Sequence, residues 1–305
     1  MSGHLKSKLT NSRIIIIYYI IIFLLTIYST YKNGVILYQK HLINIISIFK
    51  PLLMVLLSIG IAYLVNYLYY NLIKKDKYNL IDDYTPVFMA LITLTLPLNI
   101  SLILFVLIII ITSILKLFYN IEFLNYYNLI KILFFLILLI IGKYSYLTLY
   151  DTNIETNFSI IDLLFGRGVG ALGTSNIVLL IICYFIMMFN ESYKKEIPII
   201  SIISYVITLF IYDIIVKNNI VLDIKNLITN GFIFGVLFIA TIPMYSPIKN
   251  KIIIIYSILI GITSFTINKM FNIYDSVFIS IFIANIIIIV YELFERRLEN
   301  GHKRI

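Results

Sequence analysis

Long apolar runs alternate along this chain with short clusters of Lys, Asn and Asp residues. Most runs reach the roughly 17–25 apolar residues that a helix needs to cross the hydrocarbon core of a bilayer. The third and the eighth run are shorter, and each is limited by a proline. The pattern predicts ten membrane-spanning helices, at residues 14–30, 51–72, 84–97, 100–118, 128–149, 174–190, 197–216, 229–245, 252–268 and 275–294.

The two short segments resemble each other. Residues 87–97 align without gaps with residues 233–243, and four aligned pairs are identical: Phe88/Phe234, Leu91/Leu237, Thr95/Thr241 and Pro97/Pro243. Each segment is the third of five spans, and halves with an odd number of spans insert with opposite orientation, as in many transporters. The alternative is chance similarity between two apolar stretches. The sequence therefore predicts an all-α, polytopic integral membrane protein with two inverted five-helix repeats and short broken helices at the third and eighth spans.

The longest connection between predicted spans gives the domain organisation. We predict a first five-span repeat over 1–150, an outer glycine-rich loop over 151–173 and a second five-span repeat with a cytoplasmic C-terminal tail over 174–305. Basic residues precede the first apolar run, but no small-x-small cleavage site follows it. We therefore expect an uncleaved first span rather than a signal peptide.

Composition and charge agree with a membrane protein. The chain is 61% hydrophobic and 13% charged, with a mean hydropathy of +1.00, and a soluble domain of this length could not bury that much apolar surface. The net charge of +9 indicates cytoplasmic-loop lysines rather than nucleic-acid binding. With the N-terminus inside, the inner segments carry twice as many of the 24 Lys and Arg residues as the outer loops, to which Lys32, Lys217 and Lys225 are assigned. Both termini are therefore predicted to be cytoplasmic.

Several kinds of chemistry have no residues to carry them. Cys183 is the single cysteine, and the three histidines lie without metal-ligand spacing at the termini or in a loop. No phosphate loop, zinc motif or nucleophile elbow occurs. Asp213 is the acidic residue that comes closest to mid-span, and its position one turn from Lys217 predicts an ion pair on the helix surface. We predict no catalytic and no metal-ligating residue.

A glycine-rich stretch ends the predicted outer loop. Gly166, Gly168, Gly170 and Gly173 precede an apolar helix whose N-cap is predicted to be Thr174 or Ser175. Backbone N–H groups at such a helix start can bind an anion, and Arg167 is close in sequence. The alternative is a flexible entry into the helix.

A second group of small and hydroxyl residues surrounds the eighth span. Gly231 and Gly235 have the spacing that allows a neighbouring helix to approach closely. Thr241 and Ser246 can donate hydrogen bonds to carbonyls freed around Pro243 and Pro247. The alternative is a packing face that ends at prolines.

These stretches together resemble RnfD, a membrane component of the Rnf ion-translocating electron-transport complex, and its relative NqrB from the sodium-pumping NADH:quinone reductase. The family pattern Gly-Gly-x-x-Phe-Gly-x-x-Phe-x-Ala-Thr-Asp-Pro-x-x-Ser-Pro is met at nine positions and departs at Asn230 and Ile242. The glycine entry Phe-Gly-x-x-x-Gly-x-x-Gly-Glu is met by Phe165, Gly166, Gly170 and Gly173, with Thr174 in place of the glutamate. The likeness runs over roughly residues 80–295.

The resemblance implies covalent FMN, held through its phosphate on a threonine of an outer Ser-Gly-Ala-Thr-Pro-Leu-like motif. In this chain the nearest remnant of that motif is Glu155-Thr156-Asn157-Phe158. On the resemblance we identify as candidate cofactor-binding residues Thr156, Gly170, Gly173, Gly235, Thr241 and Ser246.

For function, the resemblance implies a membrane subunit of an Rnf-type oxidoreductase complex in the plasma membrane of a bacterium. Such a subunit couples electron transfer to Na⁺ or H⁺ translocation. It is expected to depend on the other subunits and on membrane lipid, with or without its own FMN, and not to bind nucleic acid. The alternative is a stand-alone inverted-repeat permease or channel for a small polar solute, and an inert assembly scaffold is a third interpretation.

Overall fold

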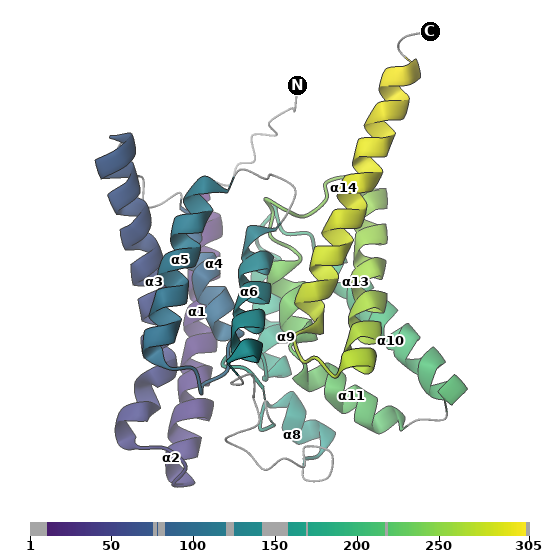
Figure 1. The fold of residues 1–305 in the computed structure, drawn as a ribbon. Helices are drawn as coiled ribbons and strands as arrows, with labels where there is room; N and C mark the ends of the chain where they lie inside the picture. Colours follow the sequence, from purple (N-terminus) through teal and green to yellow (C-terminus); the bar gives the residue numbers. More distant parts are fainter. Residues whose placement is uncertain are drawn as a thin grey trace. The chain divides into compact units, whose positions relative to one another are not determined.

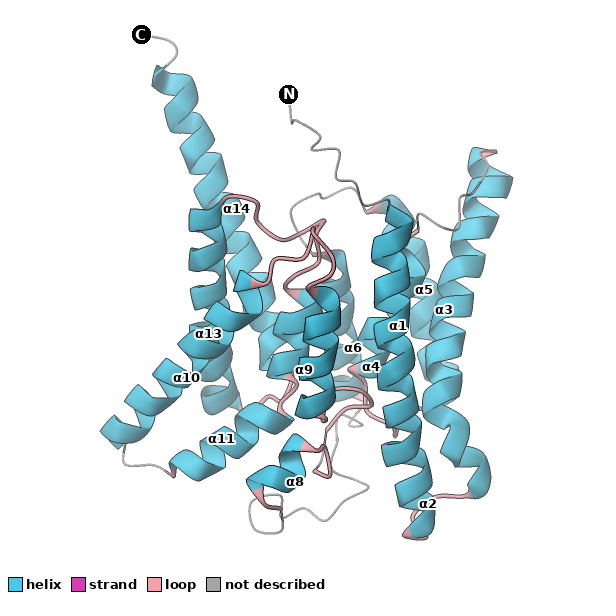
Figure 2. Cartoon of the chain, turned by 180° about the vertical axis from the view of Figure 1, so that it is seen from behind, coloured by secondary structure: helices cyan, strands magenta, loops and turns pink. Residues whose placement is uncertain are grey.

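The computed structural model describes residues 11–75, 78, 83–119, 125–141, 158–168, 170–216 and 219–302. Within these residues the chain is helical and has no strand (Figures 1 and 2). The predicted all-α class is therefore confirmed. The chain forms two compact units: unit 1 comprises Met1–Tyr119 with Phe134–Tyr193, and unit 2 comprises Asn120–Leu133 with Lys194–Ile305. The domain boundaries at 150 and 173 remain a prediction.

Unit 1 is built from long apolar helices around a short one. α1 packs against α3, α4 and α9, and α3 also packs against α4 and α5. Its elements are α1 (Asn11–Thr30), η1 (Tyr31–Ile36), α2 (Leu37–Gln39), η2 (Ile45–Phe49), α3 (Lys50–Leu68), η3 (Tyr69–Lys74), α4 (Thr85–Leu94), α5 (Leu102–Phe118), α8 (Ile160–Leu164) and α9 (Ile177–Met187). The last residues of α6 (Tyr126–Ile140) also belong to this unit.

The first helix is longer than the sequence predicts. It continues without interruption from Ser12 to Gln39, with π-helical geometry over η1. Lys32, which the sequence analysis assigned to an outer loop, therefore lies in this helix and is only 1% exposed. The sequence Lys-Asn-Gly has the polarity of a loop, but tertiary partners described below satisfy its polar groups and keep it helical.

α4 confirms that the third apolar segment is short. All ten of its residues are buried, so it is surrounded by protein on every side. Pro86 stands in its first turn, where a missing N–H costs nothing. The helix ends at Leu94, one turn before Pro97.

Unit 2 contains the second short segment. α10 packs along α13 and also contacts α11 and η5, while α14 packs against α13. Its elements are the first residues of α6 with α10 (Glu196–Val216), α11 (Ile220–Thr229), α12 (Phe232–Phe234), η5 (Gly235–Ile239), α13 (Asn250–Phe271) and α14 (Ser276–His302).

The eighth apolar segment is broken at two places. The helix formed by Ile220–Thr229 is followed, after a bend of 50°, by Phe232–Ile239. Gly231 lies at the bend with φ of +71°, in the left-handed region that favours glycine. The second break follows Ile239, before Pro243.

The structure corrects the assignment of Lys225 and its neighbours to a loop. The N-cap of α11 is Asn219, whose side-chain oxygen accepts a hydrogen bond from the Val221 amide at 3.0 Å. It buries Leu227 and Ile228, together with Asp223. The alternation of charged and apolar residues therefore marks an amphipathic helix rather than a loop.

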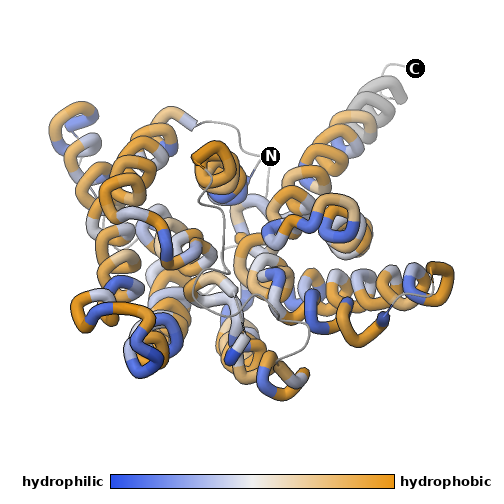
Figure 3. The backbone as a smooth tube through the Cα atoms, turned by 60° about the horizontal axis from the view of Figure 1, so that its bottom comes forward, coloured by the Kyte–Doolittle hydropathy of each residue, from blue (hydrophilic) through white to orange (hydrophobic). Residues whose placement is uncertain are grey.

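Among the residues that the structure describes, five helices are long and apolar enough to cross a membrane: Ser12–Gln39, Ile45–Lys74, Glu196–Val216, Asn250–Phe271 and Ser276–Phe294. The bent pair in unit 2 qualifies as a sixth if it is one broken span, and α4, α5, α6 and α9 are shorter apolar helices. Figure 3 shows apolar residues along most of each helix, with hydrophilic residues gathered toward helix ends and connections. The chain is a multi-pass membrane protein, while the count of ten and the inverted repeat remain predictions.

Candidate functional site

The end of α4 is joined to the glycine-rich stretch. The Gly173 amide donates to the Leu94 carbonyl at 2.7 Å, and the Leu172 amide donates to the Leu96 carbonyl at 3.1 Å. A Cβ on Gly173 would lie 3.0 Å from the Cβ of Leu94, so a side chain there would push the two segments apart. Carbonyls freed by a helix end inside a membrane protein need such partners, because no water is available in lipid. Because Gly173 has no side chain, the backbone of the glycine-rich stretch can come close enough to donate hydrogen bonds to the carbonyls at the end of α4.

The same stretch is held by the extended first helix. The buried ammonium of Lys32 donates to the Ser175 hydroxyl at 2.5 Å, and the Asn33 amide donates to the Leu172 carbonyl at 3.3 Å. These contacts explain why Lys32 and Asn33 stay helical and buried.

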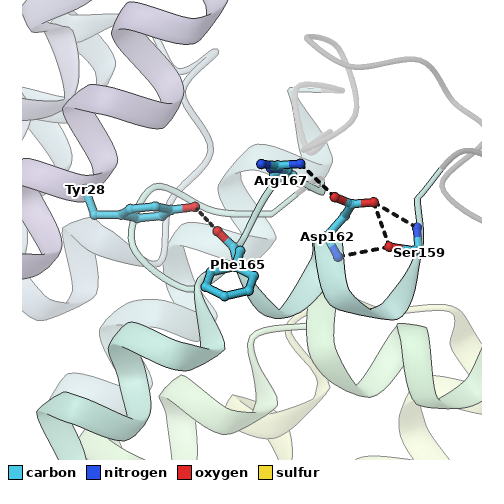
Figure 4. Close-up of polar contacts among 5 residues, drawn as sticks. All are labelled: Tyr28, Ser159, Asp162, Phe165 and Arg167. Atoms are coloured by element: carbon cyan, nitrogen blue, oxygen red, sulfur yellow. Dashed lines mark hydrogen bonds and ion pairs between the residues drawn. The ribbon is translucent and has the colours of Figure 1, made fainter.

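A tyrosine of α1 adds a third attachment. The Tyr28 hydroxyl lies 3.0 Å from the carbonyl oxygens of both Phe165 and Gly166, and Figure 4 shows it pointing at the Phe165 carbonyl. Gly166 has a φ of +75°, and a Cβ there would lie 2.1 Å from that hydroxyl. The start of the glycine-rich stretch is thus fixed to α1 through its backbone.

Some of the donors expected to bind an anion here already have protein partners. The N-cap of α9 is Asn176, not Thr174 or Ser175, and its side-chain oxygen accepts from the Leu179 amide at 2.9 Å. The Arg167 guanidinium lies 3.0 Å from a carboxylate oxygen of Asp162 (Figure 4). The amides of Leu172 and Gly173 are engaged as well, so three of the candidate donors have protein partners, and anion binding at this stretch remains a prediction.

Asp162 also begins the short helix α8. Its carboxylate and the Ser159 hydroxyl form a reciprocal capping box. The hydrogen bond from the Ser159 hydroxyl, aided by Arg167, holds the pKa of Asp162 below its ordinary value. The exposed Arg167–Asp162 pair thus has a local structural role.

In unit 2, side chains rather than a backbone segment donate hydrogen bonds to the carbonyls at the end of η5. The Asn125 amide group donates to the Ile239 carbonyl at 2.9 Å, and its oxygen accepts from the Asn128 amide at 3.2 Å. Asn125 therefore caps the start of α6 and satisfies the end of η5 at once. The Thr241 hydroxyl donates to the Leu237 carbonyl at 2.6 Å, as the sequence predicts.

A buried ion pair lies on the next turn of α6. The Lys131 ammonium is 2.9 Å from a carboxylate oxygen of Asp275, and the two side chains are 1% and 8% exposed. Asn128 donates to the Phe278 carbonyl at 2.7 Å. These contacts tie the first turns of α6 to the beginning of α14.

Gly235 allows η5 to lie close to α14. A Cβ at this position would be 2.6 Å from a Val277 methyl carbon. The close approach predicted from the Gly231-x-x-x-Gly235 spacing is therefore present at Gly235.

Ser246 departs from its predicted role. Its hydroxyl oxygen is buried and has no hydrogen-bond partner among the described residues. The carbonyl of Ser246 and that of Pro247 instead accept hydrogen bonds from the Lys194 ammonium. A lysine that precedes α10 thus replaces the predicted hydroxyl as the partner of the proline-rich turn.

Lys194 predicts a pH dependence of stability. Burial lowers its pKa from the ordinary 10.5 to about 8, against the opposing effect of Glu196. Between these two pH values the unfolded chain binds more protons at Lys194 than the folded chain does. The contribution of Lys194 to the free energy of unfolding is therefore full above pH 10.5 and is lost as the pH falls through 8. We expect the melting temperature of the wild type, relative to Lys194→Met, to rise with pH across this window. The matched variant Lys195→Met should keep the wild-type profile, and a Lys194→Met profile parallel to wild type would contradict the prediction.

The structure places the predicted site residues in both units, except for Thr156, which lies outside the described residues. Gly170 and Gly173 lie in unit 1, whereas Gly235, Thr241 and Ser246 lie in unit 2. Their role in cofactor binding remains a prediction. The sequence analysis missed Lys32, Asn125, Asn128, Asp275 and Lys194 as partners of the helix ends. The one signal in the sequence was Asn125 before an apolar run, which is typical of a helix cap.

Comparison with known protein families gives a match. The model of the NQR2, RnfD, RnfE family matches residues 127–298, more than half of the chain. The matched stretch contains Lys131, Thr241 and Asp275 and runs into α14. No curated protein matches the chain.

Proposed function

The chain belongs to the NQR2, RnfD, RnfE family, and on that basis we propose that it is a membrane subunit of an ion-translocating electron-transport complex of the Rnf type. The observation that carries the proposal is the family match over residues 127–298, which include the broken eighth segment and the Lys131–Asp275 ion pair. A bacterial plasma membrane is the location that the family suggests, and the distribution of Lys and Arg favours cytoplasmic termini.

We propose that this subunit shapes the path of the translocated Na⁺ or H⁺ at its two short helix ends. Thr95 and Thr241 are at most 1% exposed; Thr95 directly follows the end of α4, and Thr241 lies two residues after the end of η5. A carbonyl oxygen has two lone pairs, so the engaged carbonyls at these ends can still accept a second partner. Broken helices with exposed carbonyls are the places where transporters coordinate cations.

We propose that electrons pass through the neighbouring subunits, and we assign no step to a flavin at the glycine-rich stretch, where the Leu172 and Gly173 amides and Arg167 already have protein partners. Covalent FMN on Thr156 is a separate proposal. The intact mass of the purified chain tests it, because a bound flavin phosphate adds a fixed increment that Thr156→Val would remove.

The role in a complex is tested by purification through a tag on this chain in mild detergent. We expect iron–sulfur and flavin subunits to copurify, with reductase activity that depends on ferredoxin or NADH and is lost when this chain is deleted. Purification of the chain alone, with full reductase activity in the deletion strain, would overturn the proposal.

The role of the helix end is tested by a matched pair of threonines. Thr241 and Thr263 each donate to the carbonyl four residues earlier at 2.6 Å, but Thr241 does so at the end of η5 and Thr263 within α13. We expect Thr241→Val to lower ion translocation by about fivefold, the equivalent of one hydrogen bond of about 1 kcal/mol. Thr263→Val should leave translocation unchanged. Equal effects of the two variants would contradict a special role for this helix end.

The second candidate is a stand-alone permease for a small polar solute, because two short helices that end before Thr-x-Pro suit such a protein equally well. Solute uptake into liposomes that contain this chain alone would favour the permease over the component of a complex.

A further inference from the structure

Three charged side chains meet within unit 2 at one end of its helices. Asp213 lies near the C-terminal end of α10, Asp223 lies in the first turn of α11, and Lys269 lies in the last turn of α13. The Lys269 ammonium is 2.5 Å from a carboxylate oxygen of Asp223, and it also lies 5.4 Å from the centre of the Tyr212 ring. Asp213 and Asp223 are 2% and 3% exposed. Two buried carboxyl groups therefore share one ammonium group.

Asp213 is the unexplained member of this cluster. Both of its carboxyl oxygens are buried and receive no hydrogen bond from any described residue. Its carboxyl group faces that of Asp223, an acceptor set against an acceptor, because α10 contacts α11 and Lys269, the partner of Asp223, lies over the ring of Tyr212, the residue before Asp213. An ionised carboxylate in that position would be desolvated and repelled at the same time. Among the described residues, Lys269 is the positive group at this pair, so the arrangement needs one more positive charge between the two carboxyl groups.

We propose that Asp213 and Asp223 form a buried proton-binding site, in which the Asp213 carboxyl group carries a proton and donates it in a hydrogen bond to the Asp223 carboxylate. With that proton bound, the charges of Asp213, Asp223 and Lys269 sum to zero. The inference does not depend on the proposed redox function, since it follows from the charges of unit 2 alone.

The helix ends decide which carboxyl group holds the proton. Asp213 lies near the C-terminal end of α10, where the helix dipole disfavours a negative charge. Asp223 lies in the first turn of α11, where the dipole favours a negative charge, and it also pairs with Lys269. The proton therefore resides on Asp213.

The other described groups near Asp213 offer no competing base. The described elements that make the main contacts with α10 are α13, α11 and η5. Near Asp213, α13 brings Lys269, α11 brings Asp223 and, two residues on, Lys225, and η5 has only apolar or glycine residues. On α10 itself the titratable neighbours are Tyr205, which accepts a hydrogen bond from the Asn230 amide at 3.3 Å, and Tyr212. Loss of the proton would leave two carboxylates against one ammonium, so we expect the site to hold its proton at neutral pH.

Infrared spectroscopy of the purified protein in lipid nanodiscs tests the site directly. A protonated carboxyl group gives a carbonyl stretching band that is separate from the carboxylate bands and shifts in D₂O. We expect the wild type at neutral pH to show this band and Asp213→Asn to lose it while remaining folded, because an asparagine amide can donate to Asp223 as the protonated acid does. The exposed Asp162 provides the control, and Asp162→Asn should leave the band unchanged.

A second variant keeps the test independent of folding losses. Lys269→Met removes the ammonium but leaves the two carboxyl groups together, so the band should persist. A wild-type protein without the band, or an Asp213→Asn protein that retains it, would overturn the proposal. A melting temperature that rises with NaCl but not with choline chloride, in a wild type without the band, would identify a metal cation in place of the proton.

Discussion

Replacing Lys131 by methionine should lower the free energy of unfolding by about 3–5 kcal/mol, one of the two largest effects that we expect from a single substitution in this chain. Lys131 and Asp275 are both buried, and the two charged groups are 2.9 Å apart. The Lys131 ammonium also lies 5.3 Å from the centre of the Phe278 ring. Without the ammonium, Asp275 is left as an uncompensated charge at the start of α14. Reversible unfolding of the purified protein in mixed micelles measures the loss.

A double-mutant cycle separates this effect from a simple loss of packing. Asp275→Asn alone should also destabilise the protein, because it strands the buried ammonium. Lys131→Met with Asp275→Asn should lie closer to the wild type than the sum of the two single losses, since a pair replaced on both sides leaves no unpaired charge. Additive losses in the double variant would show that the two side chains are not coupled.

The short helices could be predicted from sequence because their signals are local. α4 and η5 end where a threonine and a proline follow an apolar run, and a proline cannot continue a helix. The start of the break at Gly231 also had a local signal, since a glycine can adopt the left-handed conformation found there.

The polar connections could not be predicted because their meaning depends on distant partners. Lys32 and Asn33 look like loop residues until the glycine-rich stretch, about 140 residues later, supplies acceptors for both. Asp213 was expected on a helix surface with Lys217, yet it is buried against Asp223, and Lys217 lies outside the described residues. A hydropathy profile assigns such residues to the membrane surface. A charged residue is buried only where it finds a partner, and a hydropathy profile carries no information about partners.

The candidate site shows the same division. Thr241 bonds a carbonyl one turn back along its own helix, a contact fixed by local geometry, and the sequence predicts it. Asn125 and Lys194 reach carbonyls that lie more than 50 residues away in the chain. Neither segment contains a sequence pattern that identifies its partner in the other segment. These hydrogen-bond partners could therefore be found only in the structure.

The second large effect is expected at Gly261, where α13 packs against α10. A Cβ on this glycine would lie 1.8 Å from the Ser204 hydroxyl oxygen, 2.5 Å from the Ser201 carbonyl oxygen and 2.8 Å from the Tyr205 nitrogen. Two of these atoms belong to the backbone, so no side-chain rotation relieves the clash. Gly261→Ala should therefore separate the two helices and destabilise the protein by about 1–3 kcal/mol, as overpacking does elsewhere.

Gly60 provides the matched control for Gly261. It lies within α3, and a Cβ there would have no atom within 4 Å. Gly60→Ala should therefore stabilise the protein by about 0.5–1 kcal/mol, through the helix preference of alanine alone. Opposite signs for the two variants in the same unfolding assay would establish that close packing requires Gly261. Loss of stability in both would contradict that explanation.

The carboxyl band of Asp213 tells whether the damage at Gly261 is local. Gly261 and Lys269 are eight residues apart on α13, or about 12 Å along the helix axis. A separation of the helices at Gly261 should leave the Asp213, Asp223 and Lys269 side chains in contact at the far end, so Gly261→Ala should retain the band while it loses stability. If the band disappears as well, the small-residue contact at Gly261 and the buried carboxyl pair form one cooperative structure, and the proton on Asp213 depends on the close packing of α10 against α13.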